Sequence, residues 1–156
     1  MQVSYRNGRR ARGSSIVETA AGLFVVIPIL LFFMDIGYVL VGQMANDALA
    51  KEAARAAAET NDLTGAQAMT AANNVATNYF ASEDSMFIAP PGGFSSPDTA
   101  IASVNYNPTV AGVQSGVVIV TTNIVCKVPC PFPGFPNPLQ FSATATEPIV
   151  ALLPTN

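Results

Sequence analysis

The chain opens with a polar, basic segment and then changes to an apolar run over residues 16–42. At about 1.5 Å per residue this run is longer than the roughly 30 Å hydrocarbon core of a bilayer, so it can cross a membrane as a tilted helix. Pro28 stands in the middle of the run, where it removes one backbone donor and is expected to kink the helix. The pattern predicts one N-terminal transmembrane helix.

Beyond the apolar run the pattern remains helical but changes in composition. Alanine dominates residues 44–59, and small residues let a helix pack closely against a neighbour. Asn61 and Asp62 interrupt the helix, and a second helix is predicted to run to about residue 81 after a capping box of Thr64 and Gln67. One face of this second helix is interpreted as a core face: Met69, Ala72, Ala76 and Tyr79.

Alternating apolar and polar positions in the last third of the chain predict β-strands. Residues 101–106, 117–128 and 139–146 are the strand candidates, and residues 82–93 are predicted to form a loop. Three antiparallel strands that pack against a helix can form a stable unit. Side chains expected to point inward are Val118, Val120, Ile124, Cys126, Val128, Leu139, Phe141, Ala143 and Ala145.

Together these segments predict an α+β fold. A single N-terminal transmembrane helix continues into an Ala-rich helix, and a second helix and a small antiparallel sheet follow outside the membrane. The expected organisation is a basic cytoplasmic leader over residues 1–13, a transmembrane helix over 14–45, a helical stalk over 46–82 and a small strand-rich extracytoplasmic module over 83–156.

The composition argues against catalysis. The 156 residues include no histidine, which removes the usual general base, the commonest metal ligand and the Ser-His and Cys-His nucleophile pairs. Two cysteines cannot complete a tetrahedral zinc site without other ligands. The net charge of -3 and the lack of a basic patch after the apolar run give no reason to expect nucleic acid. We expect no enzyme activity, cofactor, metal ion or small-molecule substrate.

Charge on the two sides of the apolar run predicts its orientation. Four of the seven basic residues precede it: Arg6, Arg9, Arg10 and Arg12. The positive-inside rule then places the N-terminus in the cytoplasm and the C-terminal part outside. A cleaved secretory signal peptide is the main alternative, but the run exceeds the usual apolar core of such a signal, and no small-x-small cleavage site follows closely. The interpretation is a retained single-pass anchor.

Two acidic residues interrupt the apolar run. Glu18 lies at its cytoplasmic edge, and Asp35 follows 17 positions later, about 26 Å further along a helix. Acids within a membrane are costly and are usually paired, although either residue could also simply reach a headgroup region. Both are candidate assembly residues.

The segment 9–18, RRARGSSIVE, combines a basic leader, a glycine and a glutamate that is the fifth residue after that glycine. This segment resembles the class III signal of type IV pilins and pseudopilins. The resemblance implies that a prepilin peptidase cuts between Gly13 and Ser14 on the cytoplasmic face. The new ammonium of Ser14 could then pair with Glu18 of a neighbouring subunit, because a buried charge is tolerated when it is paired.

Residues 22–37 and the Ala-rich residues 46–55 are similar to TadE-like minor pseudopilins of tight-adherence pilus systems. The resemblance implies a structural, pilin-like protein of the bacterial inner membrane, with its C-terminal domain periplasmic or extracellular. Its implied partners are the membrane and other pilin-like or membrane-complex subunits. The alternative is a single-pass accessory subunit of another membrane complex that retains its N-terminus. A membrane-tethered enzyme is a distant third.

Five prolines in residues 129–138, PCPFPGFPNP, exclude regular strand pairing between the last two strands and favour a stiff loop. Phe132 and Phe135 in this loop either contact a partner or the membrane, or fold back onto the sheet edge. Cys126 and Cys130 are a candidate disulfide, since oxidation is favoured outside the cytoplasm. Spacing alone does not bring their Cβ atoms together, so two free thiols are the alternative.

Overall fold

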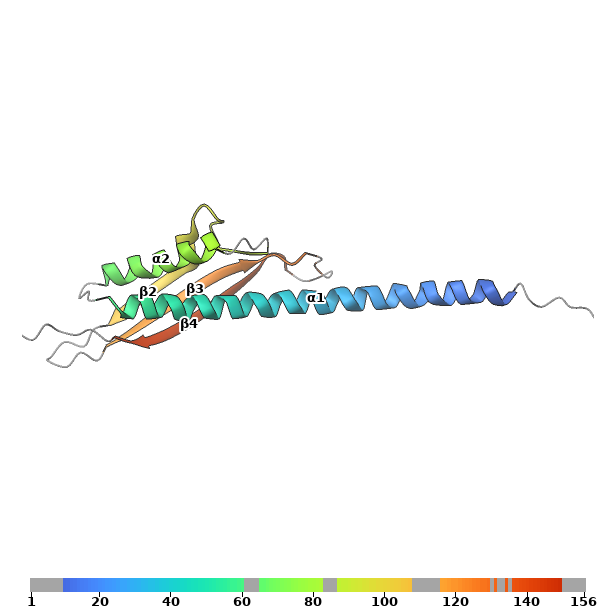
Figure 1. Cartoon of the computed structure of the whole chain (residues 1–156), viewed down its shortest axis with the longest axis horizontal. Helices are drawn as coiled ribbons and strands as arrows, with labels where there is room; N and C mark the ends of the chain where they lie inside the picture. The colour runs from blue at the N-terminus through green and yellow to red at the C-terminus, as the bar shows by residue number, and fades with distance from the viewer. Residues whose placement is uncertain are drawn as a thin grey trace, which may run out of the picture.

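The computed structural model describes residues 10–60, 65–82, 87–107, 116–129, 131, 134 and 136–149. It has one long helix, a second shorter helix and a four-stranded antiparallel sheet, which confirms the predicted α+β fold and gives a pilin-like topology. Figure 1 shows that the long helix, α1, runs the length of the molecule. Its N-terminal half extends alone, and its C-terminal half carries the sheet and the second helix, α2.

Helix α1 spans Arg10–Ala58, 49 residues, and continues without interruption from the apolar run into the Ala-rich segment, as predicted. Pro28 lies inside this helix. The character of the side chains changes along its length. Large apolar residues of the N-terminal half are exposed, whereas a stripe of mostly small residues in the C-terminal half is buried: Gly42, Asn46, Leu49, Ala50, Ala53, Ala54, Ala57 and Ala58.

Helix α2 spans Ala66–Ser82 and packs against the Ala-rich half of α1. The residues it buries are spaced by four: Ala68, Ala72, Ala76 and Phe80. The predicted core face was therefore partly wrong, because Met69 is 37% exposed and Phe80 is buried more completely than its neighbour Tyr79. Alanine on both helices allows close approach, and the long Met69 side chain has no room in such an interface. Thr64, the first residue of the predicted capping box, lies outside the described residues.

Strand β3 is the centre of the sheet. Strand β4 pairs with the whole length of β3 on one side, and on the other side β2 and then the short β1 pair with successive parts of it, all antiparallel. A short 3₁₀ helix, η1, leads into β2. The bounds are Ile88–Ala89 for β1, Pro97–Ala100 for η1, Ile101–Asn107 for β2, Val117–Cys126 for β3 and Leu139–Pro148 for β4.

One face of the sheet packs on the helices and the other is open. The inward residues of β3 are buried, and Ala143 and Ala145 of β4 are each 9% exposed, as the alternation predicted. Thr122 is fully buried on the same face, which the apolar pattern did not reveal. The two-residue strand β1 was not predicted, because a strand of this length has no alternation to detect.

Candidate functional site

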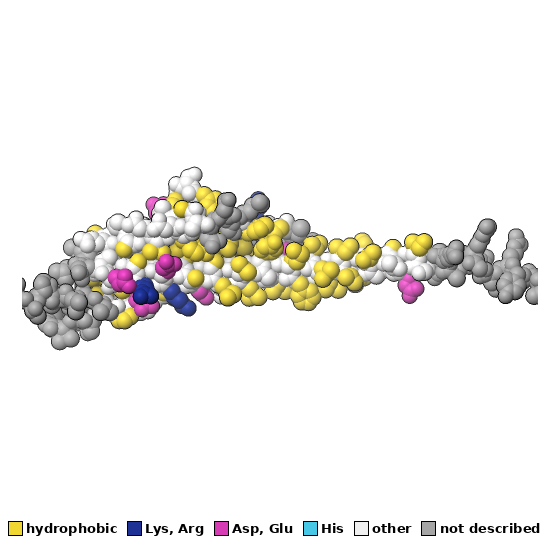
Figure 2. Space-filling view, viewed as in Figure 1, with side chains coloured by type: hydrophobic (Ala, Val, Ile, Leu, Met, Phe, Trp, Pro, Cys, Tyr) yellow, Lys and Arg dark blue, Asp and Glu magenta, His cyan; other side chains and the backbone are white. Residues whose placement is uncertain are grey.

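The N-terminal half of α1 presents apolar side chains on all sides. Five consecutive residues, 23–27, are each 48% to 80% exposed, and consecutive helical residues point in directions about 100° apart. Among the described residues one helical segment is long and apolar enough to cross a membrane, Ser15–Ala58, and its most apolar part has a mean hydropathy of 2.5 and no buried residue. Figure 2 shows this apolar surface along the part of α1 that extends beyond the sheet. Such a surface needs lipid or protein around it.

The predicted assembly residues lie at the two ends of this surface. Glu18 is exposed near the start of α1, and Asp35 is half-buried where the sheet domain begins, so the fold keeps the two carboxylates about 26 Å apart. Gly13 and Ser14, the predicted processing site, lie in the helical backbone at the start of α1. Among the side chains that the structure describes, neither acid has an ion-pair partner.

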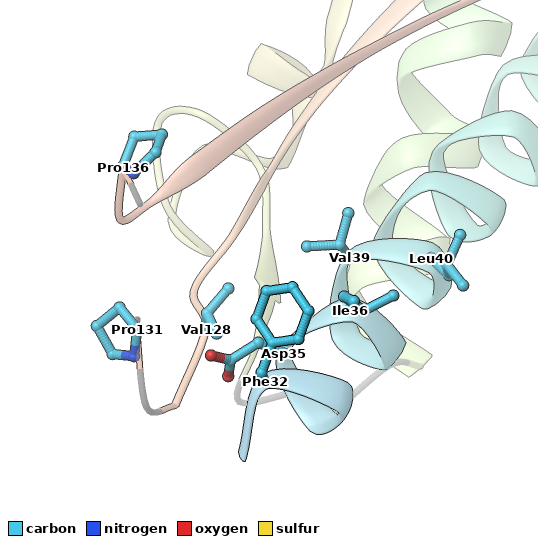
Figure 3. A pocket seen from close by; sticks show the side chains of 8 residues that line it. All are labelled: Phe32, Asp35, Ile36, Val39, Leu40, Val128, Pro131 and Pro136. Atoms are coloured by element: carbon cyan, nitrogen blue, oxygen red, sulfur yellow. The ribbon is translucent and has the colours of Figure 1, made fainter. Parts of the chain in front are cut away.

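An apolar groove surrounds Asp35. Figure 3 shows its carboxylate pointing from α1 toward the connection between β3 and β4. The groove has a volume of ≈ 210 Å³, and of its eight described lining residues Asp35 alone is charged. The other seven lining residues are apolar: Phe32, Ile36, Val39 and Leu40 on α1, and Val128, Pro131 and Pro136 on the connection. The sequence placed Asp35 near the end of the apolar run but gave no sign that the Pro-rich loop returns to it.

On the C-terminal side of the groove, α1 is held against the sheet domain. The ring of Tyr38 lies 4.8 Å from that of Phe87, measured between centroids. Gly42 is buried, and a Cβ built on it would lie 3.2 Å from Cε2 of Phe141 and 3.3 Å from Cβ of Cys126. The absence of a side chain at Gly42 therefore lets the helix approach β3 and β4 closely. These contacts fix the position of the groove on α1.

Protein-family models, curated proteins and solved structures were compared with the chain. None of them matches. The function is therefore inferred from contacts within the chain itself.

A buried polar pair fixes the register of α1 on the sheet. Thr122 of β3 donates its hydroxyl hydrogen to Oδ1 of Asn46 at 2.8 Å, and Nδ2 of Asn46 donates to the backbone carbonyl of Thr122 at 3.4 Å. Both residues are fully buried. A shift of the helix along the strand would leave these groups without partners, at a cost of about 1–3 kcal/mol for each.

Cys126 differs from the expectation for a disulfide. It is a free thiol in the structure, fully buried, with Sγ 3.8 Å from the backbone oxygen of Tyr38, to which it donates. The alternation of β3 turns its side chain toward α1, because it shares a face with Ile124. Burial raises the pKa of the thiol. Cys130, its expected partner, lies outside the described residues, as do Phe132 and Phe135.

Charged side chains gather at the other end of the domain. Figure 2 shows them over the C-terminal half of α1. Arg55 and Glu59 form an exposed i,i+4 ion pair at 3.1 Å, which contributes little stability in water. Lys51, Glu52 and Glu147 line the same shallow surface. Within the described part of the chain, no three His, Cys, Asp or Glu side chains are grouped so that they could hold a metal ion.

Proposed function

We propose that the chain is a structural, membrane-anchored, pilin-like subunit that assembles through the N-terminal half of α1 in a tight-adherence type system. The division of α1 supports this proposal most strongly. One half has large apolar side chains exposed on all sides, and the other half is the core helix of a small domain. A helix that is apolar all round is suited to lipid or to a bundle of helices. The proposed role requires no enzyme activity.

The proposed location is the bacterial inner membrane, crossed once. Residues 15–34 form the part of α1 that precedes Asp35, and at about 1.5 Å per residue they cover about 30 Å, the thickness of the hydrocarbon core. The basic residues before this segment favour a cytoplasmic N-terminus. The sheet and α2 then lie in the periplasm or outside the cell.

Glu18 is the proposed contact for assembly at the cytoplasmic end. Its carboxylate is exposed on an apolar helix and has no ion-pair partner among the described side chains. After a prepilin peptidase has cut between Gly13 and Ser14, the ammonium of a neighbouring Ser14 supplies a charge of opposite sign. Pairing the two charges offsets the cost of burying each of them between helices.

The test follows processing and assembly in the cell that makes the protein. N-terminal sequencing of the protein purified from its own membranes should find Ser14 as the first residue. Glu18→Ala should be inserted and processed normally, because it removes a charge from the helix, but it should fail to co-purify with the other subunits of the assembly. Gly13→Leu should block processing and give the same assembly defect.

Two controls make the outcome decisive. Asp47→Asn removes an exposed acid from the exported half of α1 and should assemble like the parent. Protease added to spheroplasts should digest the domain, which checks the orientation. An intact Met1 together with normal assembly of Glu18→Ala would refute the pilin-like role and favour the accessory-subunit alternative.

A further inference from the structure

The carboxylate of Asp35 has no counter-charge within the part of the molecule that the structure describes. The other described groove residues are apolar, and the closest described cation along α1 is Lys51, 16 positions away or about 24 Å along the axis. Lys127 lies on the connection, next to Val128, and forms no ion pair with Asp35. Groups that stabilise a carboxylate are cations and hydrogen-bond donors, and no described residue places one on Asp35. The groove is complementary to a ligand that is mainly apolar and carries one positive charge.

The depth of the groove indicates where that ligand is. If residues 15–34 span the hydrocarbon core, as in the proposed function on which this inference rests, Asp35 lies at the edge of the core on the domain side. Pro131 and Pro136 of the connection line the same groove. A binding partner must therefore present its positive charge at this edge, and a transmembrane helix can do so.

A second copy of this chain does not meet the requirement. Two copies at the same depth would bring Asp35 against Asp35, and like charges in a poorly solvated site repel. Lys51 and Arg55 of such a copy would be about 24–30 Å too far toward the domain. Its Lys127 lies on the connection beside Val128 and not on an apolar helix, so α1 of a second copy carries no described cation at this level. The basic residues that precede the apolar run would be about 35 Å away on the other side of the core.

We propose that the groove around Asp35 binds the transmembrane helix of a different membrane protein, through one Lys or Arg near the extracytoplasmic end of its apolar span. The aliphatic stem of such a side chain packs along Phe32, Val39 and Leu40, and its charged end meets the carboxylate. This arrangement selects a heterologous neighbour over a second copy. It uses a site distinct from Glu18, at the opposite end of the apolar surface.

The test uses the full chain in phosphatidylcholine vesicles with synthetic transmembrane peptides. One peptide is a Leu/Ala helix with a single Lys near one end of its apolar span, and its matched control has Leu at that position. Association is measured by energy transfer between labels on chain and peptide. We expect the Lys peptide to bind about 5–30-fold more tightly than the Leu peptide, the range that polar contacts of model helices give.

Asp35→Asn, which keeps the shape of the side chain and removes its charge, should abolish this preference, whereas Asp47→Asn should keep it. Equal binding of the two peptides to the parent chain would overturn the proposal. So would self-association of labelled copies that depends on Asp35. Loss of the Lys preference when phosphatidylethanolamine is added would also overturn it, because a lipid ammonium would then be the ligand of Asp35.

Protease protection of the reconstituted chain separates this result from a failure of the proposed function. A chain that spans the vesicle membrane but does not discriminate between the peptides refutes the partner and leaves the pilin-like role standing. A chain that does not span the membrane refutes the pilin-like role itself.

Discussion

The two halves of α1 form one continuous helix, but their side chains are packed differently. The N-terminal half carries large apolar side chains, of which Phe24 is 80% exposed and Leu30 57%. The C-terminal half carries alanines at its contact face, and Ala53, Ala54 and Ala57 are completely buried. Hydrophobicity alone therefore does not decide which residues form the core of this molecule. Side-chain size and the presence of a neighbouring element decide it.

Because of this difference, the two halves of α1 suit different kinds of packing. In the C-terminal half, small residues bring α1 close enough to α2 and the sheet for a close-packed interface with defined register. In the N-terminal half, large apolar side chains suit lipid or a helix supplied by another chain. Single substitutions should therefore have very different effects in the two halves, even when the chemical change is the same.

The largest contrast is expected for the same substitution at two leucines. Leu49 is completely buried, so Leu49→Ala should lower the free energy of unfolding of the sheet domain by about 2–5 kcal/mol. Leu30→Ala removes the same atoms from the exposed half and should leave the domain's stability unchanged. Protease resistance of the full chain in vesicles, followed over a urea series, measures both. Equal losses for the two variants would contradict the division of α1.

A second contrast compares two glycines of the same helix. Gly42→Val forces methyl groups against Phe141 and Cys126 and should cost about 1–3 kcal/mol of domain stability. At Gly37 no atom of the described residues, apart from the adjoining helix backbone, lies within 4 Å of the place that a Cβ would occupy, so Gly37→Val should be tolerated. The same urea series measures the difference. A destabilised Gly37→Val with an unaffected Gly42→Val would show that α1 meets the sheet elsewhere.

A third effect, of similar size, concerns the buried polar pair. Thr122→Val leaves Oδ1 of Asn46 without its donor and should cost about 1–3 kcal/mol. Thr121→Val is the matched control, because Thr121 lies on the open face, where its hydroxyl is 3.2 Å from that of Thr144, and exposed substitutions usually change stability by less than about 0.5 kcal/mol. A double-mutant cycle with Asn46→Ala should show coupling between the two sites. Strictly additive losses would show that the pair does not act as a unit.

Much of the fold could be predicted because its signals are local. The length and apolarity of residues 16–42 predict the helix, and the alternation in residues 139–146 predicts both β4 and its inward face. The facing side of α2 was partly misassigned, because Met69 and Phe80 both fit a helical stripe. Which of them is buried depends on how closely α1 approaches, and that distance is set by alanines far away in the sequence.

The candidate site was less predictable because it joins distant segments. Asp35 stands out in the sequence as an acid in an apolar run, but its groove is completed by Val128, Pro131 and Pro136. Thr122 occupies an inward position of β3 but is polar, and only the packing of α1 on β3 shows that it forms a hydrogen bond with Asn46. Likewise, only nearby side chains such as that of Phe141 explain why position 42 of the helix is a glycine.

The smallest expected effect is a change in the reactivity of the Cys126 thiol, which lies beside α1 where its two halves meet. Burial raises the pKa of the Cys126 thiol, so the neutral thiol favours the folded state. Its contribution to stability is complete at neutral pH and is lost as the pH rises through the folded-state pKa.

Alkylation of Cys126 by iodoacetamide should therefore begin at higher pH than alkylation of a free cysteine peptide, and urea should remove the difference. Cys130→Ser isolates the Cys126 signal. Alkylation at the rate of the free peptide at neutral pH would contradict the burial of Cys126. In the parent chain, alkylation in urea that requires prior reduction would instead show the Cys126–Cys130 disulfide, and Sγ of Cys126 would then have to turn away from Tyr38.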